Sequence, residues 1–312
     1  MAFTIPKETN TGKINEIILN DKRIIGGENA FPFYHFEGNF PNKPLTALEI
    51  TDIYPENWNS VLKEKYGDLL KNPVKLAKTI ENDYKADLIF INFIGTHEDN
   101  GNKSAEECSL FAKEIQNNTT LPLIIKCTGS FEKQNDVLSK IAESCDKRSC
   151  IIGSAEEKNY KTLSATCMAH NHFLIAESPI DVNIAKQTNI LITQMNFPKE
   201  KIIMDPLTGA LGYGLEYTYS VIERIRLQAF NGDEMVQMPI ISFVGQESWK
   251  VKETKVSQDK EPMWGDQEKR GILWETTTAV SLMLSGANIL VLRHPYSVTF
   301  IKETINKLSD GL

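Results

Sequence analysis

The sequence contains no long hydrophobic run and few cysteines. No stretch approaches the ~18 consecutive apolar residues that a membrane helix needs, so we expect no membrane association. The first ten residues lack the basic and then apolar pattern of a signal peptide, which makes the cytoplasm the expected location. The five cysteines are odd in number and cannot all pair within one chain, which fits a reducing compartment.

The cysteines and histidines also lack the spacings of metal or nucleophile sites. No two cysteines stand two residues apart, so an iron–sulfur or zinc cluster held by this chain alone is not expected. Cys145 and Cys150 are interpreted as buried thiols. The five histidines form no His-Glu-x-x-His pattern. His294 stands where a functional role is possible, whereas structural roles are favoured for His170 and His172. We therefore predict neither a metal ligand nor a catalytic residue.

Basic residues are fewer than acidic ones, 34 Lys and Arg against 41 Asp and Glu. The formal net charge is −7, which argues against a surface built to bind nucleic acid or anionic lipid. Hydrophobic residues make up 41% of the chain and charged residues 24%, as is usual for a globular protein with a large core.

Short apolar runs alternate with longer segments of helical spacing along most of the chain. The runs are almost continuously apolar, which is typical of parallel strands covered by helices on both faces. Expected strands cover residues 48–53, 86–94, 121–127, 150–153, 173–176, 201–204, 239–244 and 287–292. Helical spacing is clearest at 105–116, 215–230 and 275–284.

This alternation predicts an α/β fold, a (β/α)8 TIM barrel, over residues 47–312. A doubly wound open sheet is the alternative, but it usually has a glycine-rich turn after its first strand, where this chain has Thr51–Pro55. Residues 1–46 do not fit the repeat. They read as an N-terminal hairpin around Asn20-Asp21 followed by an aromatic segment, and such an extension either plugs the barrel or faces a partner.

The functional groups of such barrels lie at the carboxyl ends of the strands. Here small and polar residues occupy these ends, and glycine-rich 208–214 follows the sixth strand, where bare amides favour a phosphate or a planar ring. Residues 246–266 form a long irregular segment that we interpret as a covering flap. Lys126, one layer below the end of the third strand, keeps a Schiff-base aldolase open as a minor alternative.

Several of these segments resemble a known family. Residues 204–217 read MDPLTGALGYGLEY, and together with 220–226, 243–250, 263–266 and 292–295 they resemble the small subunit of the corrinoid iron–sulfur protein. That family includes the delta subunit of the archaeal acetyl-CoA decarbonylase/synthase complex. The resemblance covers most of the chain.

The resemblance implies a TIM-barrel subunit that carries out no catalysis by itself. Its partner is a large subunit that holds a [4Fe–4S] cluster and a corrinoid, a cobalamin-type cofactor shared with the top of the small-subunit barrel. The heterodimer accepts a methyl group from methyltetrahydrofolate through a separate corrinoid methyltransferase. It delivers this group to acetyl-CoA synthase/CO dehydrogenase in the reductive acetyl-CoA pathway. His97 has Gly95 where an Asp-x-His-x-x-Gly motif needs aspartate, so no lower cobalt ligand is predicted in this chain.

A corrin is broad and flat and carries amide-bearing arms, so small residues and amide or carboxylate groups suit it. From their rim positions we predict these cofactor contacts: Asn92, Thr128, Asp205, Gly209, Ala210, Leu211, Gly212, Tyr213, Gly214 and Gln246.

Two other functions remain open. In a pterin-dependent methyltransferase on a related barrel, Asp205 would suit the pterin edge. Such barrels usually carry Asp or Asn at the third and fourth strand ends, where this chain has Thr128 and Ser154. The second is a purely structural subunit whose rim only caps the partner.

Overall fold

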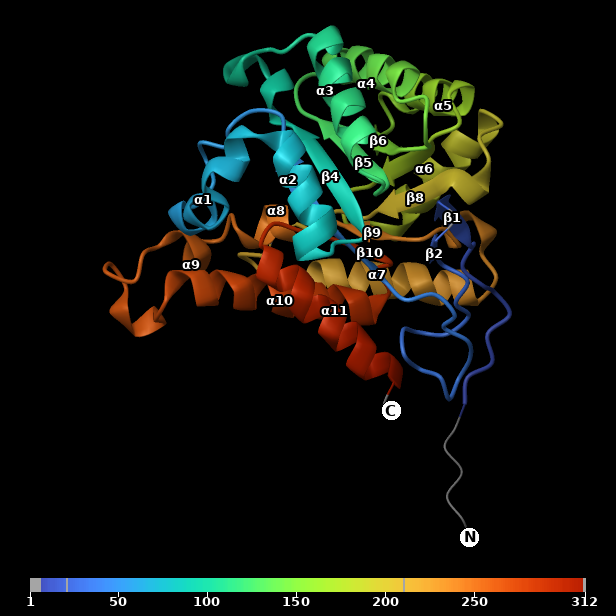
Figure 1. Cartoon of the computed structure of the whole chain (residues 1–312). Helices are drawn as coiled ribbons and strands as arrows, with labels where there is room; N and C mark the ends of the chain where they lie inside the picture. The colour runs from blue at the N-terminus through green and yellow to red at the C-terminus, as the bar shows by residue number, and fades with distance from the viewer. Residues whose placement is uncertain (1–6, 21, 210, 311–312) are drawn as a thin grey trace.

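The computed structural model describes residues 7–20, 22–209 and 211–310, and in them eight parallel strands form one sheet. The strands follow one another in the order β8, β7, β6, β5, β4, β3, β10 and β9. The two ends of the sheet meet where Met204 of β8 bridges to Ile240, and the Met204 N–H donates to the Pro239 carbonyl at 2.8 Å. The sheet therefore closes into a barrel (Figure 1). Its strands are β3 (Leu45–Thr51), β4 (Leu88–Phe93), β5 (Leu123–Cys127), β6 (Ile151–Ala155), β7 (Phe173–Glu177), β8 (Ile202–Asp205), β9 (Ile241–Ser242) and β10 (Ile289–Leu292).

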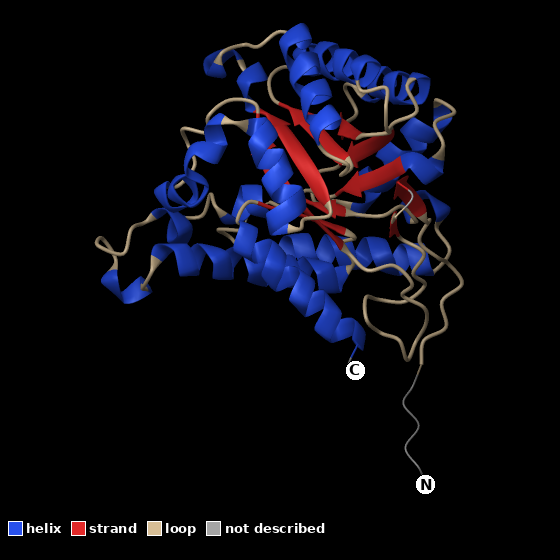
Figure 2. Cartoon of the chain, viewed as in Figure 1, coloured by secondary structure: helices blue, strands red, loops and turns tan. Residues whose placement is uncertain are grey.

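Helices follow the strands and cover the outside of the barrel, as Figure 2 shows in blue around the red sheet. They are α1 (Ser60–Tyr66), α2 (Pro73–Thr79), α3 (Ala105–Asn118), α4 (Phe131–Ser144), α5 (Tyr160–Ala169), α6 (Val182–Gln194), α7 (Glu216–Phe230), α8 (Val244–Ser248), α9 (Lys252–Lys255), α10 (Gln267–Ser285) and α11 (Pro295–Asp310). Short 3-10 or π turns cover Gly67–Lys71, Ile80–Tyr84, Ile94–Thr96, Glu98–Asn100, Lys199–Lys201, Glu234–Val236 and Pro262–Trp264. The first barrel strand in chain order, β3, pairs with the last one, β10, where Leu45 lies opposite Ile289. The predicted TIM barrel is therefore confirmed, and the alternative of an open sheet is wrong.

Apolar side chains form one layer inside the barrel and a second layer between the strands and the helices. Side chains alternate along each strand, so Leu88 and Phe90 of β4 point inward while Ile89 and Ile91 pack under the helices. The inner layer ends below the carboxyl ends of the strands, where polar side chains replace apolar ones.

The N-terminal hairpin is present as β1 (Ile17–Asn20) and β2 (Arg23–Ile25), which pair antiparallel. Ile17, Leu19 and Ile25 belong to the apolar cluster inside the barrel, together with residues at the amino ends of the strands such as Phe173. Of the two roles considered for the extension, the packing therefore matches a plug at the base of the barrel.

Most boundaries differ from the sequence prediction by a few residues, and two segments differ in kind or length. The expected strand 239–244 is regular only at β9, with a single bridge at Ile240 before it, because Val244 already begins α8. The expected helix 275–284 is the second half of α10, which begins at Gln267 where the Asp266 side chain accepts from the Lys269 N–H. The predicted flap, 246–266, consequently contains most of α8 and all of α9.

Candidate ligand site at the barrel mouth

Seven polar residues lie at the carboxyl ends of the barrel strands, above the inner apolar layer. They come from six strands and from the residue that follows β10, and they interact in two adjoining groups. We call this set the mouth cluster: Glu49, Asn92, Lys126, Ser154, Glu177, Asp205 and Arg293.

Lys126 of β5 is the centre of the first group. Its Nζ lies 2.7 Å from Glu177 Oε2 and 3.3 Å from Asp205 Oδ2, and 4.2 Å from the centre of the Phe243 ring. The Ser154 hydroxyl donates to the same Glu177 oxygen at 2.5 Å. Lys126 lies on β5, which pairs with β6. Its ammonium thus reaches past β6 to the carboxylates at the ends of β7 and β8.

The charges of this group determine its protonation. Burial disfavours the charged form of Lys126, but Glu177 and Asp205 outweigh burial and raise its pKa. Burial also acts against the Glu177 carboxylate, yet Lys126 and Ser154 lower its pKa overall. Burial is the larger effect at Asp205, and it raises the pKa of that carboxyl to about 6 although Lys126 opposes the shift. Lys126 is therefore held as an ammonium.

Arg293 is the centre of the second group. Its Nε lies 2.5 Å from Glu49 Oε2 and its Nη2 lies 3.1 Å from Glu49 Oε1, a two-point pairing of guanidinium with carboxylate. The Asn92 amide also donates to Glu49 Oε1 at 2.8 Å. Trp58 lies under the guanidinium at 5.0 Å. These contacts fix the direction of Arg293 at the mouth.

The backbone beside Arg293 is fixed by a buried carboxylate on α10. Glu275 accepts from the N–H groups of Arg293, at 2.5 Å, and His294, at 3.1 Å. It also accepts from the Ser297 hydroxyl at 2.6 Å. Glu275 thus holds the turn that enters α11.

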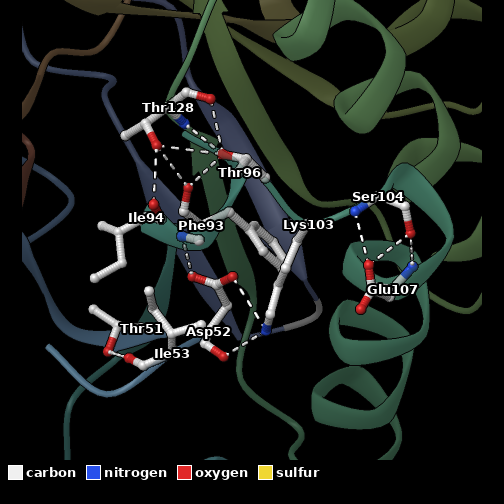
Figure 3. A network of polar contacts seen from close by, with 11 residues as sticks. Thr51, Asp52, Ile53, Phe93, Ile94, Thr96, Lys103, Ser104, Glu107 and Thr128 are labelled. Atoms are coloured by element: carbon white, nitrogen blue, oxygen red, sulfur yellow. Dashed lines mark hydrogen bonds and ion pairs between the residues drawn. The ribbon is translucent and has the colours of Figure 1, made fainter. Parts of the chain in front are cut away.

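Thr128, one of the predicted contacts, belongs to a neighbouring network rather than to the mouth cluster. Figure 3 shows the Thr96 hydroxyl between Phe93 and Thr128: it donates to the Phe93 carbonyl at 2.7 Å and accepts from the Thr128 N–H at 3.0 Å. Asp52 lies nearby, where it accepts from the Gly95 N–H at 3.0 Å and lies 3.4 Å from Lys103 Nζ. These bonds tie together the loops that follow β3, β4 and β5.

The glycine-rich loop follows β8 and is attached to the mouth at one end. The Leu207 N–H donates to Asp205 Oδ1 at 3.0 Å, and the Gly209 N–H donates to the Thr218 hydroxyl of α7 at 3.3 Å. Leu211 is buried, whereas the side chain of Tyr213 is 89% exposed. Gly212, before Tyr213, is exposed, and Gly214, after it, is half-buried. Ala210 lies outside the described residues.

Gln246 lies on α8 and is half-buried. Among the described residues, its side chain forms no hydrogen bond with the mouth cluster. The rest of the predicted flap is anchored to its neighbours. The Asn59 and Gln267 amides both donate to the Thr254 carbonyl, at 3.0 and 2.8 Å. Trp249 stacks on His294 at 6.0 Å between ring centres. The segment is therefore packed against α1 and α10 and is not a free linker.

The sequence predictions named Asn92 and Asp205 but did not single out Glu49, Lys126, Glu177 or Arg293 as a set. A signal was available. Ala47, Glu49 and Thr51 share one face of β3, and Lys126 lies among apolar residues of β5, so charges in such runs mark the interior near the strand ends. What the sequence does not show is which carboxylate pairs with which cation.

The chemistry of the mouth cluster suits the binding of a ligand better than covalent catalysis. A Schiff-base lysine must lose its proton, whereas the raised pKa of Lys126 keeps the amine charged. The nearby Cys127 thiol is buried, and burial raises its pKa. In the described ranges, histidine, cysteine and acidic side chains form no group of three placed to hold a metal ion. Within those same ranges, no helix has the length and apolar character needed to cross a membrane.

Dihydropteroate synthases are among the solved structures with the same fold. A dihydropteroate synthase of Xanthomonas albilineans matches with a TM-score of 0.60 and 10% identity, over 96% of this chain and 100% of that one. The Coxiella burnetii dihydropteroate synthase in complex with pteroic acid matches with a TM-score of 0.59 and 13% identity, over 95% and 100%. At such low identity these matches show the fold alone.

The sequence matches are more specific. The chain is 33% identical over 296 residues to the acetyl-CoA decarbonylase/synthase complex subunit delta 1 of Methanosarcina thermophila, over 93% of this chain and 67% of that relative. It is 32% identical over 289 residues to the Methanopyrus kandleri subunit delta, over 92% and 71%. The family model described as CO dehydrogenase/acetyl-CoA synthase delta subunit matches residues 19–301. The chain therefore belongs to the CO dehydrogenase/acetyl-CoA synthase delta subunit family.

Proposed function

We propose that this chain is the small subunit of a heterodimeric corrinoid iron–sulfur methyl carrier. In this proposal a large subunit holds the [4Fe–4S] cluster and the corrinoid, and the barrel mouth of this chain covers the exposed side of that cofactor. The pair receives a methyl group from methyltetrahydrofolate through a separate methyltransferase and passes it to acetyl-CoA synthase/CO dehydrogenase. Family membership and the paired charges of the mouth cluster support this function.

The residues at the mouth fit a corrin in their chemistry. The ring is large and uncharged along most of its edge, and its arms are amides that both donate and accept hydrogen bonds. The mouth cluster offers an amide at Asn92 and carboxylates at Glu49 and Glu177. Asn92 and Asp205 thus stay among the proposed contacts, as do Thr128, Gln246 and the loop residues from Gly209 to Gly214.

The part of this chain in the chemistry is to exclude water and to withhold protons. When bound, the corrinoid supplies the cobalt that carries the methyl group. The residues at the mouth would then have to keep protons away from that cobalt. Lys126 holds its proton more tightly than a free lysine because two carboxylates raise its pKa, and Asp205 is completely buried. The mouth is therefore a poor proton source at neutral pH.

Pterin binding by this chain itself is the second candidate, because its fold matches dihydropteroate synthases. A pterin would need the carboxylate of Asp205. That carboxylate already accepts from Lys126 and from the Leu207 N–H. A pterin would have to displace the lysine, which makes this function the weaker one.

The visible absorption spectrum of the purified chain, alone and co-expressed with the large subunit, tests the proposed function. We expect a corrinoid spectrum only in the pair, and a spectral change when the small subunit is removed. Identical spectra with and without this chain would contradict the proposal. Binding of methyltetrahydrofolate to the isolated chain, measured by calorimetry, would support the pterin candidate instead.

We also propose that residues 1–46 form an accessory unit of a barrel comprising 47–312, and that the protein works in the cytoplasm. Deletion of residues 1–46 tests the first point. We expect insoluble or unstable protein, because Ile17, Leu19 and Ile25 would leave the interior of the barrel open.

A further inference from the structure

We propose that the mouth cluster is a carboxamide-selective subsite, in which Glu177 and Lys126 bind an uncharged amide arm of the ligand and reject carboxylate or phosphate arms. The identity of the ligand as a corrinoid rests on the proposed function. The selectivity rests on the arrangement of the side chains in this chain.

The first argument is charge. Lys126 has carboxylates at 2.7 and 3.3 Å, and Arg293 is paired through two of its nitrogens with Glu49. Both cations of the cluster are therefore already neutralised. An anionic arm would find no unpaired cation there and would lie against Glu177. Sites that bind phosphate or carboxylate instead present an arginine, a lysine or bare amides without a competing acid.

The second argument is the hydrogen-bonding capacity that remains. Glu177 uses only Oε2 for Lys126 and Ser154, and its Oε1 accepts no hydrogen bond from the described residues. Lys126 has three N–H bonds. Among the described residues, two of these bonds donate to carboxylates, those of Glu177 and Asp205. An acceptor and a donor thus remain side by side, with side chains that are 17% and 18% exposed. A primary carboxamide has the matching pair, an N–H donor and a carbonyl acceptor.

The third argument is rigidity. Glu177 Oε2 is held by the Ser154 hydroxyl at 2.5 Å and by Lys126 at 2.7 Å, so the free oxygen has a fixed direction. Lys126 is confined between two carboxylates and the Phe243 ring. Little conformational freedom is left to lose on binding, which favours a geometric choice between ligands. A site that hydrogen-bonds a donor on its ligand discriminates strongly against an analogue that lacks the donor.

Two corrinoids that differ in their arms provide the test. Dicyanocobinamide carries carboxamides, and dicyanocobyrinic acid carries carboxylates at the same ring positions, while cyanide occupies the cobalt in both. Their dissociation constants are measured by absorption titration with the full chain and with the chain in its complex with the large subunit. A solution of 0.5 M salt screens the long-range effect of the net charge of −7.

We expect the wild-type complex to bind the amide corrinoid at least ~10-fold more tightly than the carboxylate one. Glu177→Gln should bring the two dissociation constants to within about 3-fold, because an amide at this position accommodates both arms. Glu177→Asp keeps the charge and should keep the preference. Glu98→Gln, which removes an exposed carboxylate from the loop after β4, is the matched control and should leave the ratio unchanged.

The outcomes separate the two proposals. If both corrinoids bind the wild-type complex equally, the carboxamide subsite is wrong although the corrinoid function stands. If neither binds, the proposed function fails, and the subsite fails with it. Should Glu177→Gln not fold, Ser154→Ala takes its place: it removes the hydroxyl that fixes Glu177 Oε2 and should reduce the preference, and an unchanged ratio would contradict the subsite.

Discussion

The two ends of the barrel each contain an arginine near a glutamate, but the two pairs differ in what surrounds them. At the mouth, Arg293 is paired with Glu49, and its Nη1 makes no hydrogen bond with described residues. At the base, Arg226 of α7 is completely buried. Its donors go to the carbonyls of Gly286 and Met238 and to the Asn288 side chain, and Glu28 of the N-terminal extension lies 3.8 Å away.

This difference separates a structural pair from a recognition pair. At the base, the Nε, Nη1 and Nη2 atoms of Arg226 all donate, and Asn288 links the turn before β10 to Glu28 of the extension, so the group joins three segments in the interior. The mouth leaves single donors and acceptors without a hydrogen-bond partner among the described residues, on side chains that are partly exposed. Complete burial lowers the pKa of Arg226 to about 10, and Glu28 only partly opposes this.

The largest effect on stability is expected from Arg226→Met. The change leaves the carbonyls of Gly286 and Met238 without their donor and the buried Glu28 without its counter-charge. Breaking such a buried pair costs about 3–5 kcal/mol. Urea denaturation followed by circular dichroism measures the loss. Arg224→Met, an exposed arginine on the same helix, is the control and should change little. A loss below about 1 kcal/mol for Arg226→Met would mean that the base is no more rigid than the mouth.

The packing beside the mouth is tested by Gly271→Ala on α10. A Cβ at this glycine would lie 2.2 Å from Cη2 of Trp249, whose indole is buried between α10 and His294. We expect a loss of about 1–3 kcal/mol from overpacking. Gly212→Ala is the control, because a Cβ there meets no atom within 4 Å. Equal stability of the two variants would indicate that the flap moves freely, and the mouth would then be flexible throughout.

The sequence predicted the architecture well because periodicity depends on local composition. Runs such as 121–127 and 287–292 identified strands, and the helical spacing over 215–230 identified α7. The short β9 was overestimated, since Phe243 and Val244 are as apolar in a helix as in a strand.

The site was predicted only in part. Residues at strand ends, such as Asn92 and Asp205, were found from their position alone. Thr128 shares such a position, yet its hydrogen bonds go to the loop after β4. Pairings such as Lys126 with Glu177 connect residues far apart in the chain and depend on the closure of the barrel, which no local pattern contains.

Lys126→Met should destabilise the mouth in a manner that depends on pH. Without the ammonium, Glu177 and Asp205 face each other's charge in a buried place, and their pKa values should rise. At pH 8 both carboxylates are ionised in the variant, and we expect a loss of about 1–3 kcal/mol. At pH 5 the raised pKa values allow protonation in the folded state, which restores part of this stability. Unfolding free energies of wild type and variant at the two pH values measure the difference. Lys260→Met is the exposed control, and an equal loss at both pH values would contradict the charge pairing described for Lys126.

The smallest effect on stability, and a specific effect on binding, is expected from Tyr213→Ser. With the side chain 89% exposed, its removal should change the unfolding free energy by less than about 0.5 kcal/mol. If the glycine-rich loop contacts the partner-held cofactor, the same change removes an aromatic contact from that surface. We then expect about 3–10-fold weaker association with the corrinoid-loaded large subunit, as is typical for the loss of one aromatic contact. Calorimetric titration measures the association, and Met263→Ser removes a side chain that is equally exposed on the flap. A weakening by Tyr213→Ser alone places the partner over the β8–α7 loop, a weakening by both variants extends the contact to the flap, and unchanged association for Tyr213→Ser removes the loop from the proposed site.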